Sequence, residues 1–101
     1  MQKTLPKIAF TRNAQIYRLM ASPVRLEILN HLREKDYSVD QLCKKLLLRK
    51  ANISQHLAML RHAQLVRVQR DGTRAVYSIV DPRIVDPCRI LYDLWQHKTL
   101  G

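Results

Sequence analysis

Residues 49–62, RKANISQHLAMLRH, carry the pattern that most restricts how this chain can fold. Ile53, Leu57 and Leu60 recur at helical spacing, so they share one face of a predicted helix. At about 100° per residue, the opposite face consists of small and polar residues and has no acid. These residues are Ala51, Asn52, Ser54, Gln55, Ala58 and His62. The stretch therefore predicts a helix with one buried face and one face free to contact a partner.

The polar face of this helix suits the edges of DNA bases. Gln55 and Asn52 can each form two hydrogen bonds to an adenine edge, and Ser54 can donate or accept one. Lys50 and Arg61 lie near the two ends of the helix, where DNA phosphates would lie. We interpret the stretch as a recognition helix for the major groove. An ordinary amphipathic surface helix is the alternative.

The distribution of charge supports a polyanionic partner. The chain has 101 residues and a formal net charge of +10. Residues 41–80 hold eight basic residues and the single acid Asp71, whereas the flanking segments hold most of the acids. A basic domain of this size is usually matched to a polyanion such as nucleic acid. The length suffices for one domain with one core, so we expect a single domain over residues 1–101.

Cysteine content and hydropathy indicate a soluble protein of a reducing compartment. The two cysteines, Cys43 and Cys88, are too few for a disulfide framework. Residues 1–10 lack the apolar core of a signal peptide. No apolar run approaches the roughly 18 residues of a membrane span. We expect a cytoplasmic protein with no membrane partner.

Three helices are predicted before the recognition helix. Residues 7–20 form the first, after a mobile arm over residues 1–6. Ser22 as N-cap and Pro23 at the first helical position start the second, which runs to about Arg33. Residues 37–39 suffice only for a bridging strand, and Ser38 can cap a third helix over residues 39–47. Residues 39–62 then have the parts of a helix-turn-helix.

A β-hairpin is predicted after the recognition helix. Residues 66–70 and 75–79 alternate apolar and polar side chains, and Asp71 followed by Gly72 is a strong hairpin signal between them. Arg67, Arg70 and Arg74 lie on this hairpin. A hairpin in this place is a wing, which we expect over residues 66–79. The predicted fold is thus mainly α, with about five helices and a two-stranded wing.

The last helix has an apolar face that needs a cover. It begins at one of two Asp-Pro pairs, with Asp81 or Asp86 as N-cap, and runs to about residue 98. If it begins at Asp81, Pro87 should kink it. One face is apolar and consists of Ile84, Cys88, Leu91, Tyr92 and Trp95. We expect this helix and the helix over residues 7–20 to join two copies of the chain, although capping of the monomer core is an alternative.

In this order, the elements resemble the ArsR/SmtB family of winged-helix repressors. The resemblance spans residues 21–95 and rests on ASPVRLEILNHL, SVDQLCKKL, NISQHLAMLRHAQLV and RDGTRAVYSI. It implies a homodimer joined by the first and last helices, bound to a double-stranded operator that is an inverted repeat. It also implies operator contacts from Lys50, Ala51, Asn52, Ser54 and Gln55. This chain departs from the family at Leu47, where Gly is frequent, and at Arg49, where a Ser cap is frequent; Arg49 becomes a candidate phosphate contact.

The metal sites of the family are missing from this sequence. Many relatives bind metal through Cys-x-Cys at the start of the third helix, where residues 38–40 are Ser-Val-Asp. Others use Asp-x-His at the start of the last helix and a second His from the partner. Here Arg83 and Leu94 replace the two histidines. Because the remaining groups do not make a tetrahedral zinc site, we expect no metal and no cofactor.

The two thiols are then the candidate chemical sensors. The family geometry implies that the last helices of a dimer cross near Cys88, so that two Cys88 side chains approach the two-fold axis. An intersubunit disulfide there would need Cα atoms within about 7 Å of each other. The alternative is that Cys88 is a small apolar residue of the seam. Cys43, on the apolar stripe of the third helix, is interpreted as packing, with a redox role as its alternative.

The leading functional hypothesis is a dimeric repressor of transcription, released by a chemical signal that is redox or reactive sulfur in place of metal. A winged-helix module for protein–protein interaction is the main rival. The arginines of the wing and the absence of acids on the recognition face argue against it. An enzyme is not expected, because no catalytic triad order, Gly-rich phosphate loop or carboxylate pair is present in the sequence.

Overall fold

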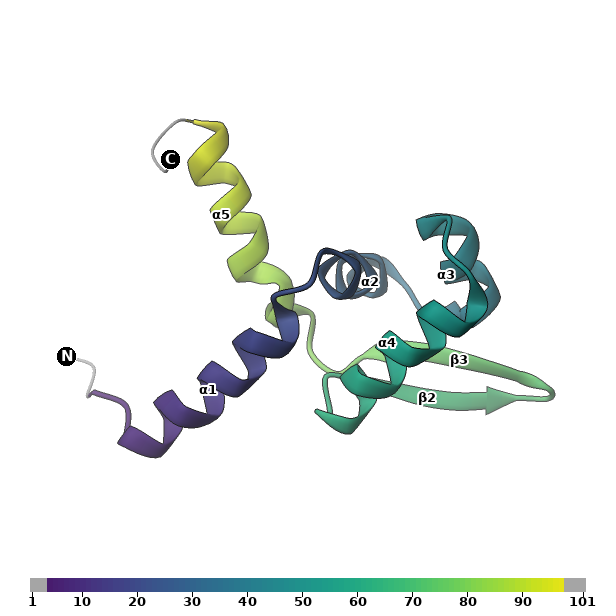
Figure 1. Ribbon diagram of the computed structural model, residues 1–101, viewed down its shortest axis with the longest axis horizontal. Helices are drawn as coiled ribbons and strands as arrows, with labels where there is room; N and C mark the ends of the chain where they lie inside the picture. Colours follow the sequence, from purple (N-terminus) through teal and green to yellow (C-terminus); the bar gives the residue numbers. More distant parts are fainter. Residues whose placement is uncertain (1–3, 98–101) are drawn as a thin grey trace.

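The computed structural model describes residues 4–97, with two groups of elements that differ in how they are packed (Figure 1). Helices α2, α3 and α4 gather against a small sheet whose hairpin extends to one side, while α1 and α5 extend away on the other side. The elements are α1 (Lys7–Met20), α2 (Pro23–Glu34), β1 (Tyr37–Ser38), α3 (Val39–Leu46), α4 (Lys50–His62), β2 (Val66–Asp71), β3 (Arg74–Ile79), the 3₁₀ turn η1 (Pro82–Val85) and α5 (Asp86–Gln96). The expectations for residues 1–3 and for residue 98 lie outside the described residues.

The hydrophobic core fixes the position of α4. Ile53, Leu57 and Leu60 each have 0% of their surface exposed, which confirms the predicted buried face of this helix. They pack with apolar residues of α2, β1, α3, the start of β2 and η1. These are Ile28, Leu29, Leu32, Tyr37, Leu42, Leu65, Val66 and Val85. Because α4 is buried along one side over its whole length, its outer face has a fixed orientation relative to the rest of the core.

The predicted caps start α2 and α3. The Ser22 hydroxyl accepts a hydrogen bond from the Arg25 backbone N–H, with Pro23 at the start of α2. Ser38 and Gln41 form a reciprocal capping box at the start of α3. α3 ends at Leu46, one residue earlier than predicted. The next residue, Leu47, has left-handed backbone angles, with φ 58° and ψ 44°, and begins the turn into α4.

The wing belongs to a three-stranded sheet with the order β1-β3-β2. The hairpin is confirmed: Asp71 pairs with Arg74 around a two-residue loop, in which Gly72 has φ +65°. The wing itself has two strands, as predicted, and the short strand β1, at the place of the expected bridging strand, joins the sheet through the pair Tyr37 and Tyr77. This strand connects the base of the wing to the start of α3. The position of the wing is therefore tied to the helix-turn-helix.

Both Asp-Pro pairs are used, but in different ways. The Asp81 side chain caps η1 by accepting from the Arg83 backbone N–H. Asp86 is not an N-cap as predicted: it is the first residue of α5, and Pro87 is the second. A proline in the first turn lacks only an N–H that has no helical partner there. The predicted helix over residues 82–98 is therefore a 3₁₀ turn followed by a shorter α-helix that ends at Gln96.

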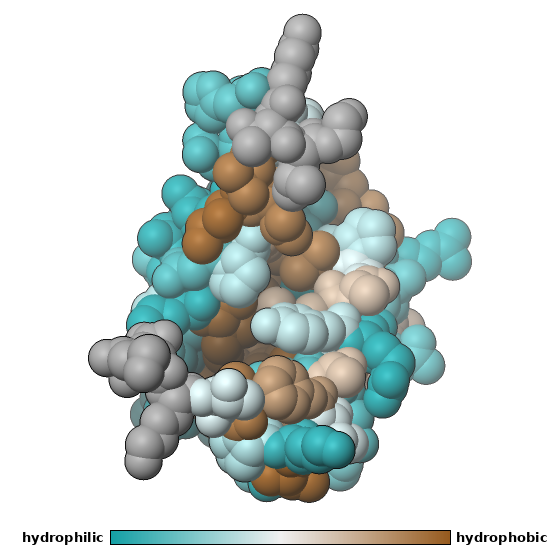
Figure 2. Space-filling model, turned by 90° about the vertical axis from the view of Figure 1, so that its left-hand side faces the viewer, coloured by the Kyte–Doolittle hydropathy of each residue, from teal (hydrophilic) through white to brown (hydrophobic). Residues whose placement is uncertain are grey.

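Helices α1 and α5 have no buried residue. They diverge from each other, and apolar side chains gather on the face of the molecule that they form (Figures 1 and 2). The exposed large apolar residues on them are Ile8, Phe10, Tyr17, Ile90, Leu91, Tyr92 and Trp95. Ile84 and Cys88 differ from the rest of the predicted seam, since both are partly buried within their own chain. α5 lies against α2 through partly buried residues such as Cys88, but it has no fully buried residue, so capping of the monomer core leaves most of its apolar face uncovered. Within residues 4–97, no helix has the length and apolar content that a bilayer span requires.

Candidate nucleic-acid interface

The outer face of α4 is open to solvent along its length. All the small and polar residues of the predicted outer face are exposed: Ala51, Asn52, Ser54, Gln55, Ala58 and His62. The first turn of the helix contains no acid. A hollow of about 630 Å³ lies beside this face, bordered by the turn after α3 and by Asn52 and Gln55. The structure therefore places the base-reading candidates together on one accessible surface.

The start of α4 differs from a conventional capped helix. Arg49 holds the N-cap position, and its side chain makes no capping hydrogen bond. The first backbone N–H groups of a helix lack intrahelical acceptors and form the positive end of its dipole. With Arg49 and Lys50 exposed beside them, this end of α4 offers both fixed and mobile positive charge to an anion.

The hairpin places two of its three arginines beside the start of α4. A second hollow, of about 320 Å³, lies between the starts of α3 and α4 and the wing. Lys50, Arg70 and Arg74 all line it. Arg67 is exposed near the base of β2, opposite Ser78, and Arg61 is exposed in the last turn of α4. Neither of these two lines the hollow. The predicted basic residues thus divide into this cluster of three, Arg49 beside the first hollow, and two separate positions.

Asp40, directly before the basic segment over residues 41–80, brings a carboxylate to this cluster. Its oxygen lies 3.6 Å from the Lys50 Nζ atom, and both side chains are largely exposed, at 75% and 71%. An exposed ion pair of this kind contributes only about 0–1 kcal/mol. Lys50 is therefore held loosely beside the basic cluster and is free to exchange its partner. Its proximity to Asp40 depends on the packing of α3 against α4, which the sequence pattern does not reveal.

Arg25 is a second residue that the sequence reasoning did not single out. It lies on α2, yet its guanidinium contacts both α1 and α4. One of these contacts is to His56, on the inner side of the recognition helix. The pKa of His56 is lowered from its ordinary value, mainly because the ring is partly buried and to a lesser extent because Arg25 is positively charged. The neutral imidazole is thus favoured next to the guanidinium.

The positions used for metal in relatives have other partners here. The Asp81 carboxylate forms an ion pair with Arg83 at 2.7 Å. Hydrogen bonds from the Arg83 side chain and backbone lower the pKa of Asp81 to about 2. Across residues 4–97, no three His, Cys, Asp or Glu side chains are grouped so that they could hold a metal ion.

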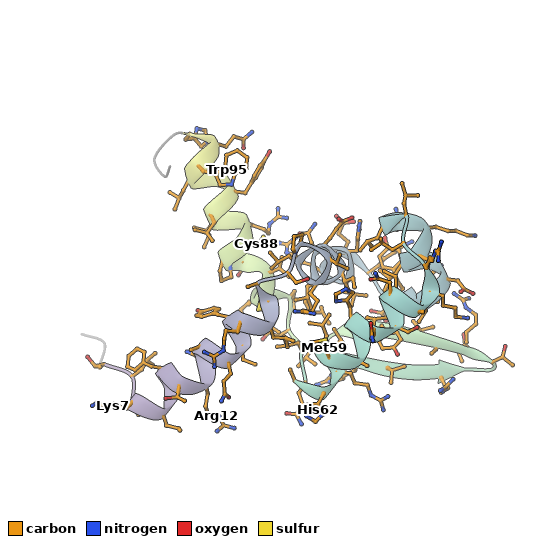
Figure 3. The ribbon with its side chains drawn as sticks, viewed as in Figure 1. Lys7, Arg12, Met59, His62, Cys88 and Trp95 are labelled. Carbon is orange, nitrogen blue, oxygen red and sulfur yellow. The ribbon has the colours of Figure 1, made fainter. Side chains whose placement is uncertain are left out.

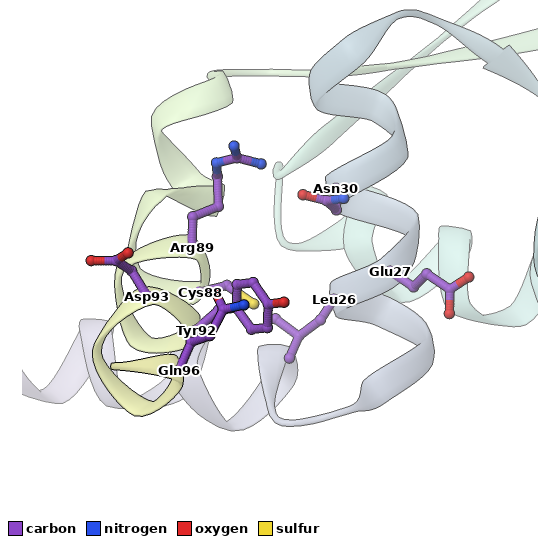
Figure 4. A pocket seen from close by; sticks show the side chains of 8 residues that line it. All are labelled: Leu26, Glu27, Asn30, Cys88, Arg89, Tyr92, Asp93 and Gln96. Atoms are coloured by element: carbon purple, nitrogen blue, oxygen red, sulfur yellow. The ribbon is translucent and has the colours of Figure 1, made fainter. Parts of the chain in front are cut away.

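Both cysteines are free and partly buried. Cys43 packs against the core from α3. Cys88 lines a groove of about 600 Å³ between α2 and α5, near Leu26 and Tyr92 (Figure 4). The thiol thus lies against its own chain while remaining partly accessible from the α5 side.

Comparison with known proteins relates this arrangement to one family. A profile described as "Bacterial regulatory protein, arsR family" matches residues 22–68. Rv0081 of Mycobacterium tuberculosis, an uncharacterised HTH-type transcriptional regulator, is 39% identical over 74 residues, which are 72% of this chain and 65% of that protein. The transcriptional repressor PagR of Bacillus anthracis is 35% identical over 80 residues, which are 78% of this chain and 80% of PagR.

Solved structures agree with this assignment. The crystal structure of Rv0081 matches with a TM-score of 0.76 and 32% identity, covering 93% of each chain. That of NolR from Sinorhizobium fredii matches with a TM-score of 0.78 and 30% identity, covering 94% of this chain and 97% of NolR. The chain spans about two thirds or less of some curated relatives, 65% of Rv0081 and 54% of KmtR from Mycobacterium tuberculosis. From the sequence and structural similarity together, the chain is a winged helix-turn-helix protein that belongs to the ArsR family of bacterial regulatory proteins.

Proposed function

We propose that this protein is a sequence-specific DNA-binding repressor of transcription that acts as a homodimer. The observation that carries the proposal is the outer face of α4, which is exposed, free of acid in its first turn and flanked by the basic cluster of Lys50, Arg70 and Arg74. Gln55 and Asn52 supply hydrogen bonds to base edges, and the cluster supplies charge for the phosphates. The printed name of PagR, a transcriptional repressor, supports the direction of regulation.

The proposal of a homodimer rests on α1 and α5. Their exposed apolar side chains include Trp95 at 56% and Tyr17 at 61% exposure. Large apolar side chains exposed in such number on one face mark an interaction site. A second copy of the chain offers the same surface, and two-fold pairing would present two α4 helices to the DNA. The operator is then an inverted repeat, with half-sites separated by about 10–10.5 bp or a multiple of it.

Selection of bound duplexes from random DNA tests this function. Enriched sequences should contain an inverted repeat, and their affinity should fall by orders of magnitude between low and physiological salt, because several phosphate contacts release counterions. The rival function, a module that binds another protein through its wing, predicts no enriched sequence. A selected pool indistinguishable from the starting pool would contradict our proposal.

Redox release through Cys88 is the candidate for the inducing signal. Both cysteines are free, and in a dimer whose last helices cross near Cys88, as the family resemblance implies, the partner for a disulfide is Cys88 of the second copy. Such a bond would alter how the α5 helices cross and hence the separation of the recognition helices. After mild peroxide treatment, non-reducing electrophoresis should give a dimer band that is absent in Cys88→Ser and present in Cys43→Ser. Monomer bands alone would leave Cys88 as a packing residue.

A further inference from the structure

We propose that Arg25 is a positioning residue for DNA recognition, which fixes the orientation of α4 by joining it to α1 through a three-helix clamp. This inference rests on the proposed function. It assigns a role to a partly buried side chain of α2 that contacts α4 through His56 and Met59 and does not belong to the predicted DNA contacts.

The guanidinium of Arg25 makes three contacts to two other helices. Its Nε–H donates to the Leu19 carbonyl of α1. One Nη atom lies 3.1 Å from His56 Nδ1 and 3.4 Å from Met59 Sδ, both on α4. Leu19 is in the last turn of α1, where carbonyls lack intrahelical donors and carry the negative end of the helix dipole. A single charged group on α2 therefore supplies a donor to a free carbonyl at the end of α1 and contacts two side chains of α4.

The region beside this clamp is not otherwise tightly packed. A groove of about 560 Å³ lies between α1 and α4 and is bordered by Leu19 and Met59. In Figure 3, Met59 lies on the part of α4 that faces α1. Because side chains do not fill this groove, the hydrogen bonds of Arg25 connect the two helices beside the apolar contacts that α1 makes with the core. Loss of the clamp should let α4 shift as a unit while its buried residues keep the fold.

His56 makes the clamp dependent on the proton concentration. To accept from Arg25, its Nδ1 must be unprotonated, with the proton on Nε2. Arg25 is the charged group that faces the ring from α2, whereas Leu19 of α1 offers a carbonyl and Met59 a thioether. The pKa of His56 is lowered by burial and then by Arg25. The clamp is therefore fully formed above the ordinary histidine pKa of about 6.5 and is lost as pH falls through the lowered value.

The test compares affinity for a selected operator with affinity for random DNA in three variants. Arg25→Lys keeps the charge but loses the planar fork, so operator affinity should fall about tenfold, the effect of one lost hydrogen bond to a charged group. Affinity for random DNA should change less than about twofold, because it depends on phosphate charge. His56→Asn keeps an acceptor that does not titrate, so it should retain operator affinity at pH 8 and lose the histidine-dependent decrease at acidic pH. His97→Gln, at the exposed end of α5, should keep the wild-type pH profile.

Nitrogen NMR of the free protein provides a readout that does not need DNA. His56 should carry its proton on Nε2 and titrate below the ordinary value, and Arg25→Met should raise its pKa by removing the guanidinium. Unchanged operator affinity in Arg25→Lys, or a wild-type pH profile in His56→Asn, would overturn the positioning role. If the wild-type protein selects no operator, the proposed function fails, and the ring nitrogens still decide whether the clamp exists.

Discussion

Helices α4 and α5 have similar apolar stripes in the sequence but opposite environments in the folded chain. Three residues of α4 have 0% exposure, whereas α5 has no buried residue and exposes Leu91 and Trp95 at 52% and 56%. Helical periodicity states which face is apolar, and it does not state what covers that face. α4 is completed by α2, α3 and the sheet of its own chain. The apolar face of α5 instead needs a surface that one copy of the chain does not supply.

This difference has a functional consequence. A recognition helix must be held rigidly to place polar groups against bases, and full burial of its inner face provides that rigidity. A helix that joins two subunits must retain apolar surface until the partner arrives. In the proposed homodimer, the two stripes contribute to two separate equilibria, folding of the chain for α4 and association of two chains for α5.

The largest expected effect follows from this separation. Leu57→Ala in α4 should lower the free energy of unfolding by about 2–5 kcal/mol, because it leaves a cavity in the core. The matched variant Leu91→Ala, in α5, should lower stability by an amount that depends on protein concentration. Urea unfolding at several concentrations measures both. If the two variants showed equal, concentration-independent losses, the contrast between the helices would be wrong.

The next effect concerns association. The ring of Trp95 packs against the ring of Tyr92 on the exposed apolar surface of α5, with centroids 5.0 Å apart. Trp95→Glu replaces this aromatic ring with a charge. We expect dissociation to monomers at micromolar concentration, since truncation or disruption of a central aromatic residue often costs about 2 kcal/mol or more. Sedimentation velocity measures the change. The exposed variant His97→Gln on the same helix should remain dimeric. A wild-type protein that sediments as a monomer would remove the basis for this assignment.

The outer face of α4 should show an effect of about 1–3 kcal/mol. Gln55→Ala removes a side chain that can read a base edge, so affinity for the best operator should fall by that amount and base preference should relax at one position. Arg70→Ala, in the wing, should weaken all sequences about equally and reduce the salt dependence. Binding titrations against single-base operator variants distinguish the two. An unchanged ranking of variants in Gln55→Ala would exclude this face from base recognition.

The sequence predicted local features well and long-range pairings poorly. The caps at Ser22 and Ser38 and the hairpin turn at Gly72 depend on residues within a few positions, and the structure contains all of them. The short strand at Tyr37 is predicted from its length alone, but its partner Tyr77, forty residues away, is not. Distance along the sequence also limits what can be predicted of the candidate site.

Neighbouring charges at the interface also depended on tertiary packing. Asp40 was counted with the acidic flank, but packing of α3 against α4 brings it beside Lys50. The Asp81 pair was read as a possible start of one long helix, whereas a 3₁₀ turn intervenes before α5. The spacing of apolar residues does not show that the chain changes from a 3₁₀ turn to an α-helix between two prolines. The exposed face of α4 was predictable because its opposite, apolar face is unambiguous.

The smallest expected effect lies in the turn that leads into α4. Leu47 has φ 58°, a conformation that costs a residue with a Cβ atom roughly 1–2 kcal/mol, and its side chain is 86% exposed. Leu47→Gly should therefore raise the free energy of unfolding by about 1 kcal/mol or less, since relief of strain exceeds the entropy that glycine adds to the unfolded chain. Leu47→Ala keeps the Cβ atom and should give no such gain, so chemical denaturation of the pair separates backbone strain from loss of the exposed side chain. Destabilisation by glycine relative to alanine would show that the left-handed conformation of Leu47 does not strain the turn.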